Sequence, residues 1–148
     1  MSDRINSRPV EILLVENNPG DVRLMTEIFR ESNMHNTLHT VRDGVEALAF
    51  LRREGDYAHA PRPGLILLDL NLPRKDGREV LAEIKEGPGL RRIPVIILTT
   101  SAAEQDIVGA YDLRANCYIT KPMGLEPFMA VMRSIGDFWL TTVRLPDR

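Results

Sequence analysis

Five short apolar runs lie along the chain, and they predict the strands of a sheet. They are Val10–Val15, Leu38–Val41, Leu65–Leu70, Val95–Leu98 and Cys117–Thr120. The first, third and fourth runs are nearly continuous rather than alternating, which is typical of strands that are buried on both faces. The second run is the least hydrophobic, so we expect its strand to lie nearer an edge of the sheet.

Segments with the apolar spacing of amphipathic helices lie between and after these runs. They are expected to begin at Asn18-Pro19, near Asp43, near Asp76, at Ser101–Glu104 and shortly before Leu125. The first begins with an N-cap residue and a proline, and the fourth with the Ser-x-x-Glu pattern of a capping box. The second and third are expected to stop at Gly55 and at Gly87-Pro88, since glycine and proline commonly end helices.

This alternation of strands and helices, repeated five times, predicts an α/β fold. The simplest arrangement is a doubly wound, five-stranded parallel sheet of the flavodoxin-like order 2-1-3-4-5, with helices on both faces. A length of 148 residues fits one domain. We expect its core to span about 9–140, followed by a short C-terminal extension at 141–148. The segment 55–64 is expected to form a surface loop.

Composition narrows the class of protein. Hydrophobic residues make up 43% of the chain and charged residues 27%, with a net charge of −2. There is no basic excess that would indicate nucleic acid or an anionic membrane surface. No signal peptide is visible, and no apolar run approaches the roughly 20 residues that cross a bilayer. One cysteine, Cys117, excludes an internal disulfide, and the histidines lack metal-site spacing. We expect a soluble, cytoplasmic protein.

Polar residues follow the predicted strands at the edge where a parallel sheet binds its ligands. They are Glu16-Asn17-Asn18 after the first strand, Asp69 in the third, Thr99-Thr100 at the end of the fourth, and Lys121-Pro122 after the fifth. A carboxylate nucleophile, oxygen ligands for a divalent cation, and donors to phosphoryl oxygens would thus lie together. The pattern indicates phosphoryl transfer.

These residues resemble the receiver domain of response regulators in bacterial two-component signalling. The match rests on Glu16, on Asp69 within LLDLNLPRKDG, on Thr99, and on the pair Lys121-Pro122. The subgroup that serves bacterial phytochromes is resembled by four segments: ILLDLNLPRKDGREVLAEIK, IPVIILTTS, NCYITKP and DFWLTTVRLP.

The resemblance implies that Asp69 accepts a phosphoryl group from a sensor histidine kinase of the phytochrome type. It implies that Thr99 hydrogen-bonds this group and that Lys121 pairs with it. The cofactor would be Mg²⁺, with the implied ligands Glu16, Asn17, Asp69 and the main-chain carbonyl of Asn71.

The resemblance also implies a switch. Movement of Thr99 toward the phosphoryl group would let Tyr118 turn inward, which remodels the face of the fourth helix, fifth strand and fifth helix.

Asn17 departs from the family pattern, because receivers usually carry two acids after the first strand. The amide keeps a coordinating oxygen but lacks the charge, so weaker Mg²⁺ binding is expected. Asp21, one turn into the helix, is expected to cap it rather than replace the missing ligand. The alternative function is therefore a receiver-like interaction module whose phosphorylation is weakened or lost.

Two other classes fit less well. A hydrolase of the haloacid-dehalogenase type needs a second acid two residues after the nucleophile, where this chain has Asn71. We therefore expect no enzyme, only a phosphoacceptor with at most self-catalysed phosphotransfer and autodephosphorylation. A flavin binder is disfavoured because the first loop, ENNPGD, is acidic where phosphate would bind.

The C-terminal segment predicts self-association. The expected fifth helix has one apolar stripe, which is what packing on the sheet requires. The end of the chain carries more large apolar residues than this one face can cover, namely Phe138, Trp139, Leu140, Val143 and Leu145. The resemblance to the phytochrome-associated regulators implies a two-fold homodimer through the fourth helix, fifth strand and fifth helix, with the tail in or beside the interface. The alternative is that the tail folds back over its own core. No room for a DNA-binding module is expected, so output is expected through protein contacts or onward phosphotransfer, without nucleic acid or membrane.

Overall fold

A computed structural model describes residues 9–31, 35–99 and 117–120. All five strands are parallel and form one sheet in the order β2-β1-β3-β4-β5. They are β1 (Val10–Val15), β2 (Asn36–Val41), β3 (Leu65–Leu68), β4 (Val95–Thr99) and β5 (Cys117–Thr120). The predicted strand order is confirmed, and so is the place of β2 at an edge.

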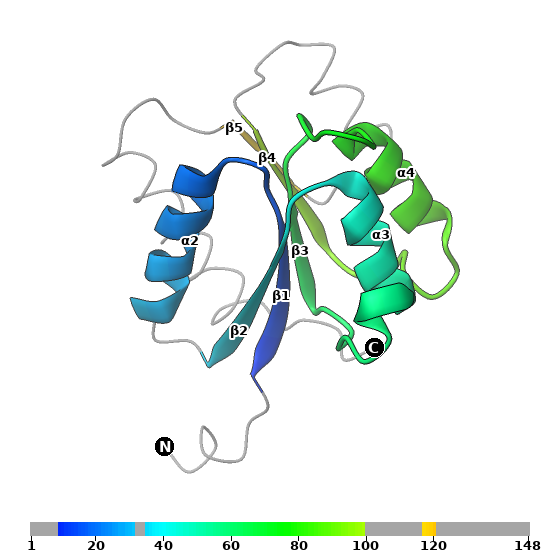
Figure 1. Cartoon of the computed structure of the whole chain (residues 1–148), viewed down its shortest axis with the longest axis horizontal. Helices are drawn as coiled ribbons and strands as arrows, with labels where there is room; N and C mark the ends of the chain where they lie inside the picture. Colours follow the sequence, from blue (N-terminus) through cyan, green and yellow to red (C-terminus); the bar gives the residue numbers. More distant parts are fainter. Residues whose placement is uncertain (1–8, 32–34, 100–116, 121–148) are drawn as a thin grey trace.

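Helices cover both faces of this sheet, as predicted (Figure 1). On one face lies α2 (Pro19–Glu31), and on the other lie α3 (Gly44–Arg52) and α4 (Gly77–Glu86), with a 3₁₀ turn, η1 (Gly55–Tyr57), after α3. The fourth and fifth predicted helices and the tail 141–148 lie outside the described residues. Within the described part of the chain, no helix has the length and apolarity that crossing a membrane requires.

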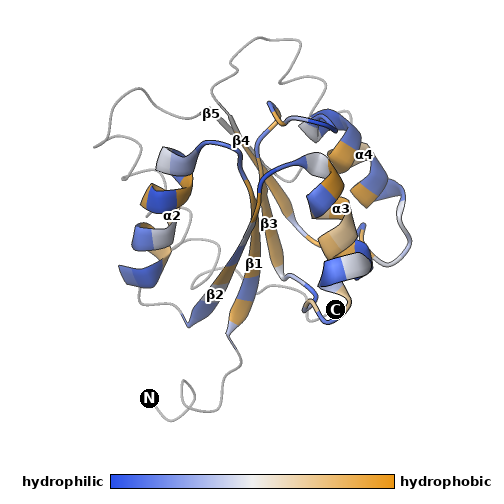
Figure 2. Ribbon diagram, in the orientation of Figure 1, coloured by the Kyte–Doolittle hydropathy of each residue, from blue (hydrophilic) through white to orange (hydrophobic). Residues whose placement is uncertain are grey.

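The core has two parts because successive residues of a strand point to opposite faces. Ile12 and Leu14 of β1 pack with Phe29 of α2, whereas Leu13 and Val15 pack toward α3 and α4. Apolar side chains therefore lie on both sides of the central strands, whose ribbons are largely in the hydrophobic colour in Figure 2. Burying each large one contributes roughly 1.5–3 kcal/mol. The continuous apolar runs of the sequence reflect this two-sided burial.

Two predicted boundaries are wrong in informative ways. The third strand ends at Leu68 rather than Leu70, because the chain turns after Asp69 although Leu70 is still fully buried. The second helix ends at Arg52 rather than Gly55. Arg53 takes the left-handed conformation, with φ 57°, and its N–H donates to carbonyls of the last turn. An arginine thus ends the helix in the left-handed conformation that glycine usually adopts at this position.

Candidate functional site: the carboxyl edge of the sheet

Glu16 and Asp69 lie at the same edge of the sheet. The last register pair between the adjacent strands β1 and β3 joins Val15 to Leu68, and each acid is the next residue. Asp69 N–H donates to the Val15 carbonyl at 3.1 Å, which continues the pairing by one bond. Glu16 is 1% exposed and Asp69 8% exposed. Two carboxylates are therefore held, largely buried, at the ends of neighbouring strands.

The loop after β1 is held by a bond to the end of β2 and by side chains of its own residues. Glu16 N–H donates to the Val41 carbonyl at 3.0 Å, and its Oε2 accepts a hydrogen bond from Asn18 N–H at 3.2 Å. Asn18 Oδ1 in turn accepts from Asp21 N–H at 3.1 Å, which is the N-cap that the sequence predicts for α2. Asn17 lies between them and is exposed.

The loop after β3 is packed closely against the phosphoacceptor candidate. Asp69 Oδ1 accepts a hydrogen bond from the N–H of Asn71 at 3.0 Å. Gly77, the first residue of α4, lies against the backbone of this turn. A Cβ added there would be 2.6 Å from Leu70 Cα and closer still to the Asp69 carbonyl oxygen. Only glycine allows α4 to begin this near to Asp69.

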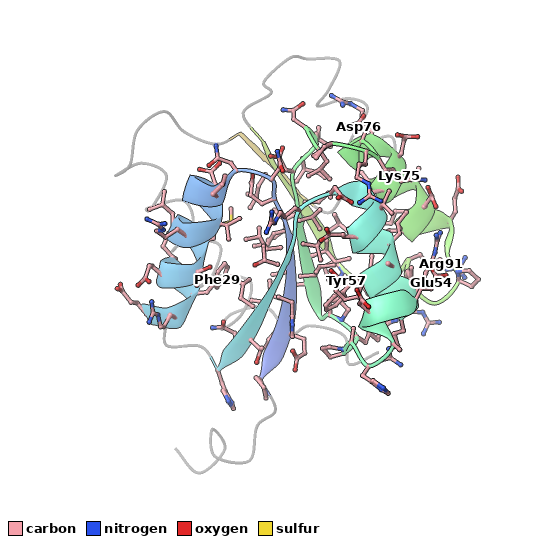
Figure 3. All side chains as sticks on the ribbon, viewed as in Figure 1. Phe29, Glu54, Tyr57, Lys75, Asp76 and Arg91 are labelled. Carbon is pink, nitrogen blue, oxygen red and sulfur yellow. The ribbon has the colours of Figure 1, made fainter. Side chains whose placement is uncertain are left out.

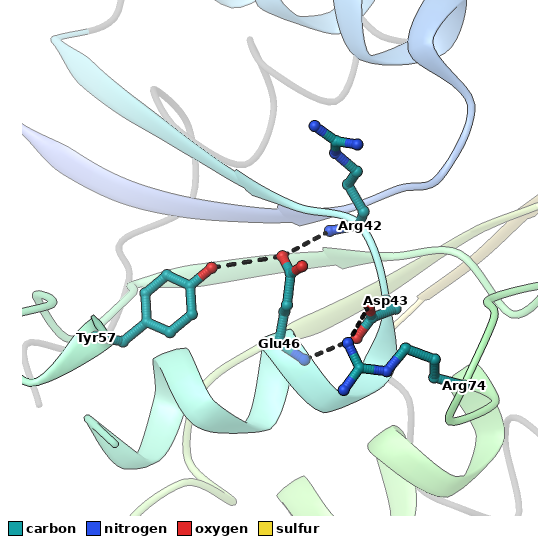
Figure 4. A network of polar contacts seen from close by, with 5 residues as sticks. All are labelled: Arg42, Asp43, Glu46, Tyr57 and Arg74. Atoms are coloured by element: carbon teal, nitrogen blue, oxygen red, sulfur yellow. Dashed lines mark hydrogen bonds and ion pairs between the residues drawn. The ribbon is translucent and has the colours of Figure 1, made fainter. Parts of the chain in front are cut away.

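A polar network joins the start of α3 to the same loop (Figure 4). Asp43 caps α3 by accepting from Glu46 N–H at 2.8 Å, and its other carboxylate oxygen lies 3.2 Å from Arg74 Nη1. Glu46 accepts from the Tyr57 hydroxyl and from Arg42 N–H, each at 3.4 Å. Burial, followed by the charge of Glu46, raises the pKa of Tyr57.

Lys75 connects the loop to both helices of this face. Its ammonium group pairs with Glu83 of α4, and the other Glu83 oxygen accepts from Arg52 of α3 at 2.8 Å. These two hydrogen bonds, Lys75 first, hold the pKa of Glu83 below its usual value. Figure 3 shows Lys75 and Asp76 near the beginning of α4, well apart from Glu54 and Arg91 at the opposite end of the helices.

The remaining predicted site residues are placed only in part. Thr99 is the last residue of β4, whose neighbour is β3, and Tyr118 lies in β5 in register with Ile97. The side chains of Thr99 and Tyr118 lie outside the described part of the structure, as does all of Lys121. Their roles stay predictions.

The chain also compares closely with known proteins. The family model for the response regulator receiver domain matches residues 12–133. The chain belongs to this family. The receiver is 52% identical over 146 residues to response regulator Rcp1 of Synechocystis sp., covering 99% of each protein.

Two solved structures are similar over nearly their whole length. The Mn²⁺-bound form of Rcp1 has a TM-score of 0.91 and 52% identity, covering 93% of the receiver and 99% of that chain. The phosphorylated cyanobacterial phytochrome response regulator RcpA has a TM-score of 0.92 and 54% identity, covering 95% and 100%. The strand order of this chain and its similarity to these solved structures both show the flavodoxin-like fold.

The donor groups at this edge of the receiver suit a hard divalent cation. Glu16 and Asp69 offer carboxylates, Asn17 an amide oxygen and Asn71 a main-chain carbonyl, and Mg²⁺ prefers oxygen ligands. Across 9–31, 35–99 and 117–120, no three His, Cys, Asp or Glu side chains form a metal-binding group.

Sequence reasoning missed the groups that hold the β3 loop in place, namely Gly44, Arg74 and Gly77. A signal was present: Asp43-Gly44 and Asp76-Gly77 are both Asp-Gly pairs at the start of a helix. In each pair the aspartate precedes the helix, and the glycine lies against the chain that follows Asp69.

Proposed function

We propose that this receiver accepts a phosphoryl group on Asp69 from a sensor histidine kinase and passes the signal on through protein contacts. The observation that carries the proposal is the buried carboxylate of Asp69 beside Glu16 at the carboxyl edge of the sheet. Rigid placement supports nucleophilic attack, because a carboxylate held in one orientation needs less rearrangement to reach phosphorus.

The proposed step is a simple displacement. A carboxylate oxygen of Asp69 bonds to phosphorus as the bond from phosphorus to the kinase histidine nitrogen breaks, and the freed imidazole takes up a proton. The product is an acyl phosphate on Asp69. Thr99 would donate a hydrogen bond to a phosphoryl oxygen and Lys121 would pair with its charge. The receiver is itself the acceptor of the phosphoryl group, so it does not convert a separate bound substrate into product.

Mg²⁺ is the proposed cofactor, and it would neutralise the charge that gathers between Asp69 and the incoming phosphoryl group. Glu16, Asn17, Asp69 and the carbonyl of Asn71 are its proposed ligands. The Mn²⁺-bound structure of the relative Rcp1 supports a divalent cation. Asn17 is expected to lower the affinity, since an amide oxygen attracts the cation less than a carboxylate.

Labelling with a small phosphoryl donor tests the proposal. Incubation with Mg²⁺ and acetyl phosphate should add one phosphoryl group, seen as a single increment in intact mass. Asp69→Asn should abolish the increment, because the amide keeps the shape but is not nucleophilic. Asp56→Asn, the same change at an exposed position of η1, is the matched control and should label normally. Undiminished labelling of Asp69→Asn would overturn the assignment.

A kinase of the phytochrome type is the proposed partner. RcpA, at 54% identity, is a cyanobacterial phytochrome response regulator, and its solved structure is phosphorylated. Transfer from a phosphorylated phytochrome kinase to this receiver should be faster than from an unrelated histidine kinase at equal concentration. Equal rates would contradict the choice of partner.

Asn17 favours one alternative function, an interaction module that works without phosphorylation. Its exposed amide removes one charge from the proposed cation site. This alternative would be supported if acetyl phosphate left the mass unchanged even at saturating Mg²⁺.

A homodimer is proposed through the face of the fourth predicted helix, β5 and the fifth predicted helix, together with the tail 141–148. Deleting the tail in combination with Phe138→Ala should shift micromolar protein toward monomer in sedimentation velocity. Val45→Ala removes an exposed apolar group from α3 and serves as a control that should keep the dimer. A monomeric wild-type protein at high concentration, with and without phosphoryl donor, would refute the dimer.

A further inference from the structure

The loop from Asn71 to Asp76 follows the phosphoacceptor and leads into α4. Two of its backbone hydrogen bonds join residues only two apart, Leu72 N–H to the Leu70 carbonyl at 3.1 Å and Lys75 N–H to the Pro73 carbonyl at 2.7 Å. Such short turns fix the angles between neighbouring residues but do not place the loop relative to the sheet. The bond from Asn71 N–H to Asp69 Oδ1 anchors the start of the loop at the end of β3, and contacts with α3 and α4 place the rest.

The start of α3 contacts this loop at two successive residues. Asp43 accepts from Arg74 Nη1 at 3.2 Å through one carboxylate oxygen and caps α3 through the other. Beside it, Gly44 lies so near Lys75 that an added Cβ would be 2.7 Å from Lys75 Cβ. The Asp43 side chain is 8% exposed, so losing either partner would leave a poorly solvated carboxylate.

Arg74 is the unusual residue of the loop. Its φ of 66° lies in the left-handed region, which glycine and asparagine adopt far more readily than arginine. Residues in that region persist where the surrounding structure holds them there. Glycine would fit the backbone with less strain, so the arginine must contribute something through its side chain. The contact that it makes is the ion pair with Asp43.

We propose that Asp43 and Arg74 are positioning residues for the phosphorylation site. Their ion pair ties the loop to α3 and so keeps Asn71 against Asp69, with the Asn71 carbonyl in place for the cation. Neither residue is among the groups proposed to hold the cation or the phosphoryl group. Without the pair the loop occupies this arrangement for a smaller fraction of the time, and the apparent affinity for Mg²⁺ falls by the same fraction. The inference rests on the proposed function.

Three variants of the full chain separate this role from general stability. Arg74→Gly removes the guanidinium group while relaxing the strained backbone, and Asp43→Asn keeps an acceptor for Glu46 N–H while removing the charge. Arg53→Gly is the matched control. Arg53 also has positive φ, at 57°, and is exposed, but it lies at the opposite end of α3 from Asp43.

Two measurements without a phosphoryl donor decide the matter: hydrogen exchange of the Asn71 amide, and Mg²⁺ affinity by calorimetry. Arg74→Gly and Asp43→Asn should each speed exchange at least threefold and weaken Mg²⁺ binding three- to tenfold. The double variant should do no more than either single one. Relief of the strained backbone at Arg74 should offset the unpaired charge of Asp43, so urea unfolding of Arg74→Gly should stay close to that of the wild type. Arg53→Gly should match the wild type in exchange and affinity.

Phosphorylation adds a further readout. With acetyl phosphate, the labelling rate of Arg74→Gly should be reduced at low Mg²⁺ and restored at saturating Mg²⁺. Exchange and Mg²⁺ affinity of Arg74→Gly equal to those of Arg53→Gly would overturn the inference. A wild-type protein that binds Mg²⁺ but never labels would instead overturn the proposed function, because the two deciding measurements use no donor.

Discussion

The loop after β1 and the loop after β3 bring a carboxylate to the same edge of the sheet, but they are held in different ways. In the first loop, Glu16, Asn18 and Asp21 bond to one another within six positions of the chain. In the second, Arg74 pairs with a residue 31 positions away and Lys75 with one 8 positions away. The side-chain bonds of the first loop are therefore local, whereas the ion pairs of the second reach to two helices.

This difference separates two kinds of control over the site. The loop after β1 should keep its shape whenever β1, β2 and α2 form, so a change at Asn17 should alter chemistry alone. The loop after β3 depends on where α3 and α4 sit. Substitutions in those helices can therefore alter the surroundings of Asp69 without touching it.

Glycine-to-alanine substitutions should show the largest difference in stability between the two loops. Gly77→Ala forces a methyl group into the backbone at Asp69 and Leu70, and overpacking of this kind costs roughly 1–3 kcal/mol. Gly20→Ala, in the first turn of α2 just after the other loop, meets only the Asn18 side-chain oxygen at 3.2 Å and gains helix propensity. Urea unfolding should show a loss of about 2 kcal/mol for Gly77→Ala and a change within about 0.5 kcal/mol for Gly20→Ala. Equal effects would show that the two loops are equally constrained.

An acid at position 17 would test whether the loop after β1 can change in cation affinity without changing in stability. Asn17→Asp adds a charge at an exposed position that does not hold its loop together. Mg²⁺ binding should tighten by about tenfold, which corresponds to roughly 1.4 kcal/mol, while the unfolding free energy without Mg²⁺ stays nearly constant. Asn18→Asp is the neighbouring control and should change Mg²⁺ affinity less. An unchanged Mg²⁺ titration of Asn17→Asp would remove Asn17 from the cation site.

Acid should loosen the loop after β3 slightly. The folded-state pKa of Glu83 is held below its ordinary value of 4.5 by Lys75 and then Arg52. This contribution to stability is present above pH 4.5 and is lost as the pH falls through the lower folded-state pKa. Because Glu83 is partly exposed, the effect should be roughly 0.2–1 kcal/mol.

Unfolding measured at about pH 6 and about pH 3 would test this expectation. Glu83→Gln should show a smaller loss of stability on acidification than the wild type. Glu86→Gln, at an exposed position of the same helix, should lose as much as the wild type. A Glu83→Gln profile parallel to that of the wild type would contradict the role of the ion pair.

The strands and their order were predictable because apolar runs directly report burial on both faces of a sheet. The same signal misplaced the end of β3, since Leu70 is buried in a turn and burial alone does not distinguish turn from strand. The end of α3 was misplaced because Arg53 adopts a conformation that local rules reserve for glycine. Propensity is a weak guide wherever tertiary contacts hold a residue in place.

At the site, the positions of Glu16 and Asp69 were predictable because parallel strands end at a common edge. The cap at Asn18 was also predictable, since it depends on residues close in sequence. The pair of Asp43 with Arg74 was not, because no periodicity relates residues 31 positions apart. Local chemistry can thus be inferred from the chain, whereas the contacts that hold it in position need coordinates.

The acids at the two ends of β1 have a consequence for strand alignment. Alternate residues of β1 face the two core clusters, and both faces are apolar. A slip by one residue would exchange the faces, and apolarity alone would not oppose it. Slipping one way would draw Glu11 away from His39, which it contacts at 2.7 Å, into the buried stretch. Slipping the other way would move Glu16, already buried, from the edge where Asn18 N–H donates to it into the apolar core. Both errors leave a carboxylate in apolar surroundings without its polar partner. Glu16, proposed here for cation binding, would therefore also fix the register of the central strand during folding.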